Sequence, residues 1–248
     1  MIPPNGVAIT WLGHATVLLE SPTGTRVLID PWLEGNPKLP EVVPDLTRLD
    51  AVLVTHGHFD HMASVVPVVQ ATGAPVVCIP EISAYLAYRG VANRWEMNKG
   101  GTHAVGDFLA TMVMADHSGG IDVEGGMPSV EGGDPVGFII RHEASSQSIY
   151  VAGDTNVFGD MRLIHELYHP QVGILPIDGN HNMGPREAAL AVDLLEIRWV
   201  IPIHYGTFPV LAGRPEDLRT ALAARRSSCE VLTLEPGQRY TVSEQGGE

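Results

Sequence analysis

The stretch Thr55-His56-Gly57-His58-Phe59-Asp60-His61 carries most of what this sequence says about its fold and chemistry. It places three imidazoles and a carboxylate within six residues, directly after the apolar run Ala51-Val52-Leu53-Val54, which has the length and composition of a buried strand. Neutral imidazoles together with a carboxylate suit a borderline metal such as Zn²⁺. Core packing explains such a cluster poorly, because each buried imidazole would need its own hydrogen-bond partner. The stretch therefore predicts a metal site at the end of a strand.

Three further candidate ligands have the same position relative to an apolar, strand-like run. They are His117, Asp154 and His204, and each follows the end of its run as His56 does. A single histidine is more often structural than a ligand, but the placement repeats at four independent strand ends. In open α/β sheets, ligands gather outside the carboxyl ends of the strands. We therefore expect these side chains to converge at one edge of the fold.

Strand and helix signals alternate along the chain. A hairpin is expected over 7–12 and 16–20, a third strand over 25–30, and a loop over 31–48. Helices are predicted over 61–72, 81–89, 159–168, 186–195 and 215–226. The other strands are predicted over 51–55, 76–79, 102–117 with a turn, 136–142, 148–153, 172–176 and 199–203, with two short strands near the end. Strands followed by helices, in an order that repeats, predict two stacked α/β halves within one domain spanning 1–248.

The composition limits the classes of partner. The net charge of −14 argues against general binding to a nucleic-acid backbone. Two distant cysteines indicate no disulfide framework, and residues 1–5 lack the basic start of a signal peptide. No window reaches 18 apolar residues, so no membrane span is expected. We expect a cytoplasmic protein that acts on a small molecule, and the sequence is compatible with a homo-oligomer.

In these motifs the chain resembles the metallo-β-lactamase-fold hydrolase superfamily. The resemblance is carried by the stretch 55–61, by His117, by Ala152-Gly153-Asp154-Thr155 and by Ile203-His204-Tyr205-Gly206. Within the superfamily, Thr10-Trp11-Leu12-Gly13-His14-Ala15-Thr16 and Ile29-Asp30-Pro31 look like one branch. That branch holds poorly characterised metal-dependent hydrolases, ascorbate-6-phosphate lactonase and N-acylphosphatidylethanolamine-hydrolysing phospholipase D. The resemblance implies a four-layer αββα sandwich with a metal site at its open edge.

The resemblance also implies two divalent metal ions, Zn or Mn ahead of Fe or Ni. The implied ligands are His56, His58 and His117 for the first metal, Asp60, His61 and His204 for the second, and Asp154 as a bridge. Seven ligands are too many for one tetrahedral Zn²⁺ but suit two metals that share a carboxylate and a water. Such a pair holds hydroxide near neutral pH, and the hydroxide attacks a carbonyl or phosphoryl centre. We count Asp60 among the catalytic residues as well.

Four residues outside this ligand set have expected roles. Asp30 is expected to orient the histidine cluster by accepting an N–H bond, with an ordinary turn aspartate as the alternative. His14 either contacts substrate or pins the first hairpin. In the turn 179–185, backbone N–H groups could hold an anion, with Asn180 as a substrate contact and His181 as the proton donor to a leaving group. The alternative is a polar turn whose asparagines cap the next helix.

The sequence thus predicts a metal-dependent hydrolase, with a small phosphorylated lactone or a phosphodiester as the favoured substrate. A simple lactone, ester or amide, including a β-lactam, is the alternative within the same chemistry. A non-catalytic metal-binding protein and a di-iron redox protein are the alternatives of another class. The family's di-iron oxygen reductases typically carry Glu where this chain has His58, which favours hydrolysis. The Gly-rich segment 118–134 is either a flap that gates substrate or a surface loop.

Overall fold

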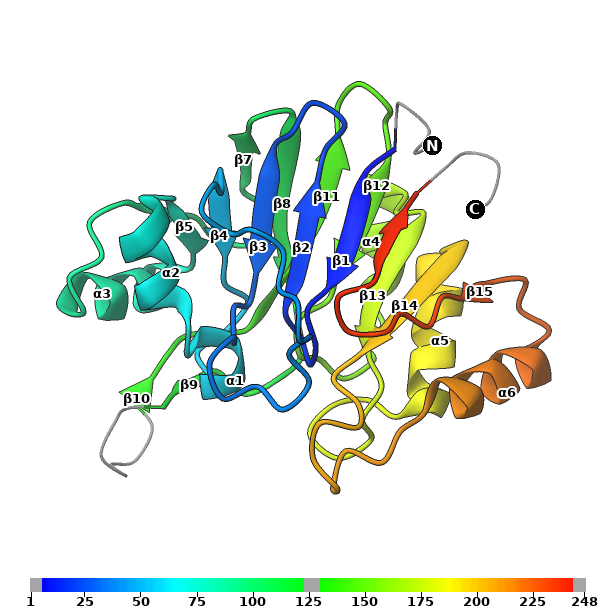
Figure 1. The fold of residues 1–248 in the computed structure, drawn as a ribbon. Helices are drawn as coiled ribbons and strands as arrows, with labels where there is room; N and C mark the ends of the chain where they lie inside the picture. The colour runs from blue at the N-terminus through cyan, green and yellow to red at the C-terminus, as the bar shows by residue number, and fades with distance from the viewer. Residues whose placement is uncertain (1–5, 123–129, 243–248) are drawn as a thin grey trace.

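The computed structural model describes residues 6–122 and 130–242, so the residues 1–5 considered for a signal peptide lie outside it (Figure 1). Its strands form two seven-stranded sheets and one two-stranded ribbon. The first sheet has the order β16 (Arg239–Thr241), β1 (Ala8–Trp11), β2 (Val17–Glu20), β3 (Arg26–Ile29), β4 (Ala51–Leu53), β5 (Val76–Cys78) and β6 (Arg94–Glu96). The second has the order β15 (Glu230–Val231), β14 (Trp199–Ile203), β13 (Val172–Pro176), β12 (Ser148–Val151), β11 (Val136–His142), β8 (Phe108–Met114) and β7 (Thr102–Val105). The ribbon pairs β9 (Gly120–Ile121) with β10 (Val130–Glu131).

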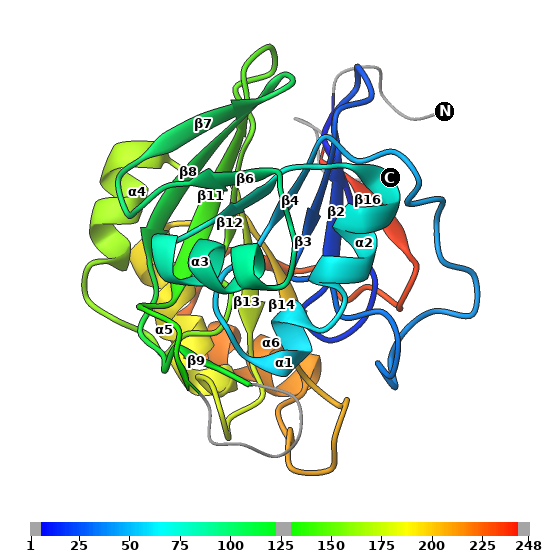
Figure 2. The ribbon, with the colours of Figure 1, turned by 90° about the vertical axis from the view of Figure 1, so that its left-hand side faces the viewer.

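Helices cover the outer faces of both sheets, as the view along the sheet edges shows (Figure 2). The helices of the described residues are α1 (Phe59–Met62), which lies at one end of the sandwich, α2 (Val65–Thr72), α3 (Pro80–Tyr88), α4 (Met161–Tyr168), α5 (Pro185–Leu195) and α6 (Pro215–Arg225). α2 and α3 lie outside the first sheet, and α4, α5 and α6 lie outside the second. The predicted four-layer αββα sandwich is therefore confirmed. Within the described ranges, none of these helices is long and apolar enough to cross a bilayer.

The helix expected over 61–72 is in fact two helices, and the sequence analysis was wrong to join them. α1 and α2 are separated at Ser64, whose Oγ accepts the backbone N–H of Leu33 at 2.8 Å. The N–H of Ser64 donates to the carbonyl of Pro31 at 2.9 Å, so this residue ties the loop after β3 to the start of α2. α2 ends as predicted at Gly73, which has the left-handed conformation (φ 73°) of a glycine cap. The sequence analysis also missed β6, a three-residue edge strand with no local alternation.

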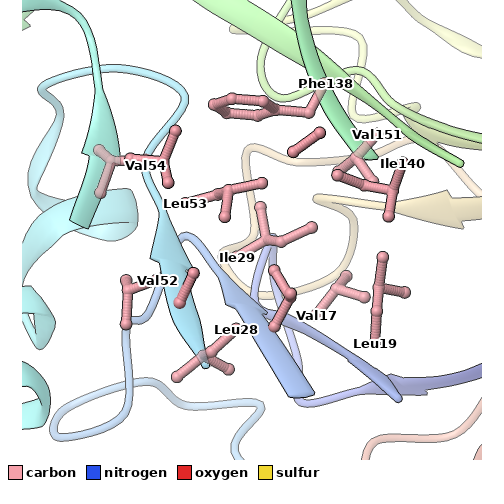
Figure 3. Close-up of a cluster of buried hydrophobic side chains, with 14 of the residues drawn as sticks. Val17, Leu19, Leu28, Ile29, Val52, Leu53, Val54, Phe138, Ile140 and Val151 are labelled. Atoms are coloured by element: carbon pink, nitrogen blue, oxygen red, sulfur yellow. The ribbon is translucent and has the colours of Figure 1, made fainter. Parts of the chain in front are cut away.

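Side chains of β11 alternate between two apolar cores, as a period of two requires. Phe138 and Ile140 belong to the core between the sheets, whereas Ile139 packs with the residues under α4, α5 and α6. Figure 3 shows Phe138 and Ile140 across from Ile29 and Leu53 of the first sheet. The two sheets therefore hold each other through apolar side chains, and the polar cluster is confined to one end.

We expect Leu53→Ala to lower the free energy of unfolding by about 2–5 kcal/mol, because the side chain is fully buried and its removal leaves a cavity. Leu167→Ala is the matched control. Its side chain is 66% exposed on α4, so the change is expected to stay within about 0.5 kcal/mol. Urea denaturation measures both values. A Leu53→Ala effect no larger than that of the control would contradict this account of the core.

The strand directions bring the predicted ligands to one end of the molecule. β3 and β4 are parallel in the first sheet. In the second sheet β8, β12, β13 and β14 share one direction, because β11 is antiparallel to both β8 and β12. Backbone hydrogen bonds join the two sheets at this end, from Val136 N to the carbonyl of Thr55 and from His204 N to that of His14, each at 3.0 Å. Side chains that follow these strands therefore meet.

Candidate metal centre

All seven predicted metal ligands lie together at this end of the sandwich. Their nitrogen and oxygen atoms form three overlapping groups, in each of which the atoms lie within 4.8 Å of one another. The groups are His56, His58 and His117; His14, Asp60, His61 and His204; and His56, His61 and Asp154. We call His56, His58 and His117 the first ligand group, and Asp60, His61 and His204 the second. His14 joins the second group in space, which the sequence analysis did not expect.

The carboxylate of Asp154 lies between the two ligand groups. Its Oδ1 is 3.3 Å from His61 Nε2, and its Oδ2 is 3.2 Å from His204 Nε2. The same Oδ2 is 3.6 Å from His117 Nε2, on the side of the first ligand group. Asp154 is 2% exposed, so these contacts are made away from solvent. A carboxylate in this place can reach a cation in either group.

Three residues of the site have the left-handed backbone conformation that favours glycine. They are His14 (φ 55°), Asp30 (φ 48°) and His204 (φ 59°). Such a conformation costs about 1 kcal/mol or more in a non-glycine residue and persists only where the surroundings enforce it. At Asp30 the side chain accepts both the backbone N–H and the hydroxyl of Thr55, at 2.8 and 2.7 Å. Thr55 also packs directly against Gly153. This position has a positive φ of 63°, and a Cβ there would lie only 2.7 Å from Cβ of Thr55, so glycine leaves the space that Thr55 occupies.

Hydrogen bonds fix the tautomers of two histidines. His61 Nδ1 donates to Asp30 Oδ2 at 2.8 Å, because an ionised carboxylate only accepts. The hydroxyl of Thr55 donates its single proton to the same carboxylate. His56 Nδ1, 3.0 Å from the hydroxyl oxygen, must therefore be the donor to that oxygen. In the neutral form that binds a metal, both rings then carry the lone pair on Nε2. This is the pattern of metal-ligating histidines, whose other nitrogen is held by a partner behind them.

Asp178 is a site residue that the sequence analysis missed. Its Oδ2 lies 3.0 Å from His204 Nδ1. The two atoms form a close ion-pair contact, but their angles are poor for a hydrogen bond. Its Oδ1 accepts the backbone N–H groups of Asn180 and His181 at 2.8 and 2.7 Å. Burial would raise the pKa of this carboxyl, but His204 and the turn N–H groups lower it to about 2. Asp178 follows the end of β13 as Asp154 follows β12, so the same strand-end rule could have found it.

The turn that holds Asn180 and His181 differs from its expected form. Both residues are exposed, and their N–H groups already bond to Asp178 instead of being free for an anion. The capping alternative is wrong, because the residue at the start of α5 is Gly184 and no side chain caps the helix. The turn is thus fastened to Asp178, which also touches His204. The roles of the two side chains stay predictions.

His14 is fully buried and uses both ring nitrogens within the chain. Its Nε2 is 2.8 Å from Asp60 Oδ2, and its Nδ1 is 2.9 Å from the hydroxyl of Thr207. Burial lowers its pKa to about 4 despite the bond to Asp60, so the ring is neutral near pH 7. Neither nitrogen is free for the substrate contact expected from the sequence.

Several buried polar atoms of the cluster have no hydrogen-bond partner. Whether these atoms would suit a cation decides whether a metal fits the site. Among the described residues these atoms include His61 Nε2, His204 Nε2 and Asp154 Oδ1. The two histidine nitrogens lie 3.3 and 3.2 Å from the oxygens of Asp154 in ion-pair contacts, and a buried polar atom without any such contact would cost about 1–3 kcal/mol. Cations held by these atoms would complete their contacts, and imidazole with carboxylate is the donor set that Zn²⁺ and its neighbours accept. The residues present therefore fit divalent cations.

The charges of the two ligand groups differ. Burial lowers the pKa values of His56, His58 and His117, so the first ligand group presents neutral imidazoles. Burial also opposes a charge on His61, but the nearby carboxylates, led by Asp154, raise its pKa to about 10. The second ligand group therefore lies in a concentrated negative field, which favours cations.

The Gly-rich segment contacts the metal-ligand stretch directly. Asp122 accepts the backbone N–H of Phe59 at 3.2 Å, and the hydroxyl of Ser118 lies 3.4 Å from His58 Nε2. The described parts of the segment include the short ribbon β9–β10. The middle of the expected flap, residues 123–129, lies outside the described residues. The described part nevertheless borders the first ligand group.

Comparisons with known proteins agree with this architecture. A family model described as "Beta-lactamase superfamily domain" matches residues 25–205, a range that contains all seven candidate ligands. A "UPF0173 metal-dependent hydrolase" of Koribacter versatilis is 45% identical over 237 residues, covering 96% of this chain and 99% of its own. A protein of the same name from Rubrobacter xylanophilus is 47% identical over 234 residues, covering 94% and 96%. The solved structure of Igni18, described as a novel metallo hydrolase from Ignicoccus hospitalis, has a TM-score of 0.84 at 31% identity and covers 96% of this chain and 99% of its own.

Proposed function

The chain belongs to the beta-lactamase superfamily, and from this membership and the geometry of its site we propose a metal-dependent hydrolase that uses two divalent cations. The membership confirms the resemblance found in the sequence. The observation that carries the proposal is the pair of ligand groups on either side of Asp154. Zn or Mn are the proposed cations, with Fe or Ni as less favoured occupants of the same ligands.

The proposed distribution of ligands over the two cations follows the distances between the ligand atoms. His56, His58 and His117 would hold one cation, Asp60, His61 and His204 the other, and Asp154 both. When bound, such cations lower the pKa of nearby water and stabilise negative charge that develops on a reacting oxygen.

The chain's own residues hold this arrangement in place. Asp30 and Thr55 keep the lone pairs of His61 and His56 toward the cluster. Asp178 contacts His204 and also fastens the turn that carries His181. We propose that His181 delivers a proton to the leaving group, a role that its exposed position on a fixed turn supports. Asn180, on the same turn, is the proposed substrate contact.

A half-buried lysine supports an anionic substrate, such as a small phosphorylated lactone or a phosphodiester. A Cβ built on Gly206 would lie 3.7 Å from Lys38 Nζ, so this ammonium lies close to the loop that follows His204. Across residues 6–122 and 130–242, no carboxylate pairs with Lys38 within 4.0 Å. A lysine that has no carboxylate partner and lies near a cation site is suited to hold a phosphate group.

A row of aromatic side chains favours a second candidate, an uncharged lactone, ester or amide, including a β-lactam. This aromatic wall consists of Trp32, Phe59 and Phe208. Phe59 and Phe208 are 48% and 36% exposed, and their rings lie 5.4 and 6.0 Å from that of the buried Trp32. The Phe208 ring is also 6.3 Å from that of His14, so the wall borders the second ligand group. Apolar surface in this position suits an apolar part of a substrate.

Two variants separate the substrate classes. Lys38→Met is expected to lower kcat/KM for phosphorylated substrates about tenfold, through KM, because one charge-assisted contact is lost. Phe208→Ala is expected to lower kcat/KM for apolar lactones or esters about fivefold, since about 1 kcal/mol of apolar contact is lost. Each variant is the control for the other, and steady-state kinetics on both substrate types measures them. Equal effects of both variants on both types would contradict the assignment of these surfaces.

Metal analysis together with a substrate panel tests the function itself. Protein purified without added metal is analysed for elements and assayed with chromogenic phosphodiester, lactone and β-lactam substrates. About two metals per chain and hydrolysis lost on chelation are expected. Trace metal with no activity after addition of Zn²⁺ or Mn²⁺ would overturn the proposal in favour of a non-catalytic protein. Two irons with oxygen uptake from an electron donor would overturn it in favour of redox chemistry.

A further inference from the structure

We infer that His14 and Thr207 form a positioning pair that orients Asp60 toward the second cation, an inference that rests on the proposed two-cation function. The chain of contacts runs from the Thr207 hydroxyl to His14 Nδ1 at 2.9 Å, and from His14 Nε2 to Asp60 Oδ2 at 2.8 Å. Asp60 thus has its own support, separate from that of His56 and His61, which depend on Thr55 and Asp30.

The direction of these hydrogen bonds follows from the groups involved. Asp60 is a carboxylate and only accepts, so His14 Nε2 carries the proton and donates it. A neutral imidazole has one N–H, which leaves Nδ1 as an acceptor. The hydroxyl of Thr207 must therefore donate to Nδ1. Thr207 supports this tautomer by donating to Nδ1, and His14 in turn holds the Asp60 oxygen that lies 3.5 Å from His204 Nε2.

The surroundings give the His14 ring no other orientation. Its side chain is fully buried, its ring centroid lies 3.8 Å from that of His204, and the Trp32 ring centroid lies 5.1 Å away with the two ring planes at 90°. The backbone is held as well, because the His14 carbonyl accepts Trp11 Nε1 at 2.9 Å and the N–H of His204 at 3.0 Å. A ring held this way can position a ligand by its hydrogen bond. It has no free nitrogen with which to bind substrate.

Thr207→Val tests the pair with little change in shape, since it replaces one hydroxyl with a methyl group. Without the donor, His14 Nδ1 loses its partner, and the ring is held toward Asp60 by one polar contact instead of two. We expect one of the two cations to bind about 10–100-fold more weakly, the range for loss of a group behind a metal ligand, with the other unchanged. Thr207→Ser keeps the hydroxyl and is expected to stay within about twofold of the parent. Zn²⁺ titration of the metal-free protein against a chelating indicator measures both affinities.

Further variants separate positioning from a merely structural role. Thr220→Val removes an exposed hydroxyl in α6 that bonds the Glu216 carbonyl, and should leave both affinities unchanged. His14→Phe should reproduce or exceed the effect of Thr207→Val on one cation. If Thr207→Val and His14→Phe bind both cations as the parent does, the inference is wrong. It is equally wrong if both cations weaken together with the Tm of the metal-free protein.

The parent protein also separates this inference from the proposed function. A parent that binds only one Zn²⁺ per chain would refute the two-cation proposal. The pair would still be supported if that ion bound more weakly to Thr207→Val and normally to Thr207→Ser. It would be overturned if neither variant changed the affinity.

Discussion

Asp154→Asn is expected to reduce hydrolysis by at least about three orders of magnitude, because it removes the carboxylate placed between both ligand groups. Asparagine keeps the shape of the side chain but loses the charge that the proposed pair of cations would need. The metal content should fall from two per chain toward one or none. Both kcat on the best substrate of the panel and elemental analysis of the purified variant measure the effect.

Asp193→Asn is the matched control for this substitution. Asp193 is an exposed aspartate of α5 that pairs with Arg225 at 2.6 Å, and such surface pairs contribute about 0–1 kcal/mol. The control should keep full activity and both metals. Asp154→Asn with two metals and activity within tenfold of the parent would refute the bridging role. Loss of both metals without loss of activity would refute metal dependence.

The ligand positions could be predicted because each depends on local sequence. An apolar run of strand length, followed by a histidine or an aspartate, is visible without any knowledge of pairing. His56, Asp154 and His204 were found in this way. Asp154 and His204 follow strands that share one direction in the second sheet, and His56 follows β4 where a backbone hydrogen bond of Thr55 joins the two sheets. The family resemblance then supplied the layer order of the sandwich, which the strand pattern alone left as two stacked halves.

The supporting contacts could not be predicted, because they join residues distant in the sequence. His14 and Thr207 are 193 positions apart, and no local pattern marks either as a partner of the other. The break at Ser64 has the same origin, since its contacts are with the loop after β3. Two residues are exceptions: Asp178 has a strand-end position that is visible in the sequence, and the family resemblance suggested Asp30 as an acceptor for the histidine cluster, where His61 Nδ1 lies 2.8 Å from its Oδ2.

Removal of the metals is expected to lower the Tm by at least about 15 °C. A cation present at 1,000 times its Kd contributes about 4 kcal/mol to the folded state, so two contribute about 8 kcal/mol. In a chain of this size each kcal/mol shifts the Tm by about 2–4 °C. The direction follows from the structure as well, since buried atoms such as His61 Nε2 and Asp154 Oδ1 contact each other at 3.3 Å but lack a well-aligned hydrogen bond in the metal-free cluster. Calorimetry before and after chelation and dialysis measures the shift.

Re-addition of metal identifies the cause of that shift. If bound cations stabilise the fold, Zn²⁺ or Mn²⁺ restores the original Tm in the parent and in Asp193→Asn, but not in Asp154→Asn. A chelator that acted on the protein in another way would leave all three proteins equally altered after dialysis. An unchanged parent Tm throughout would mean that the cluster tolerates its unpaired buried atoms without a cation. The Tm would then not support bound metal as a part of the folded protein, regardless of the results of the activity assays.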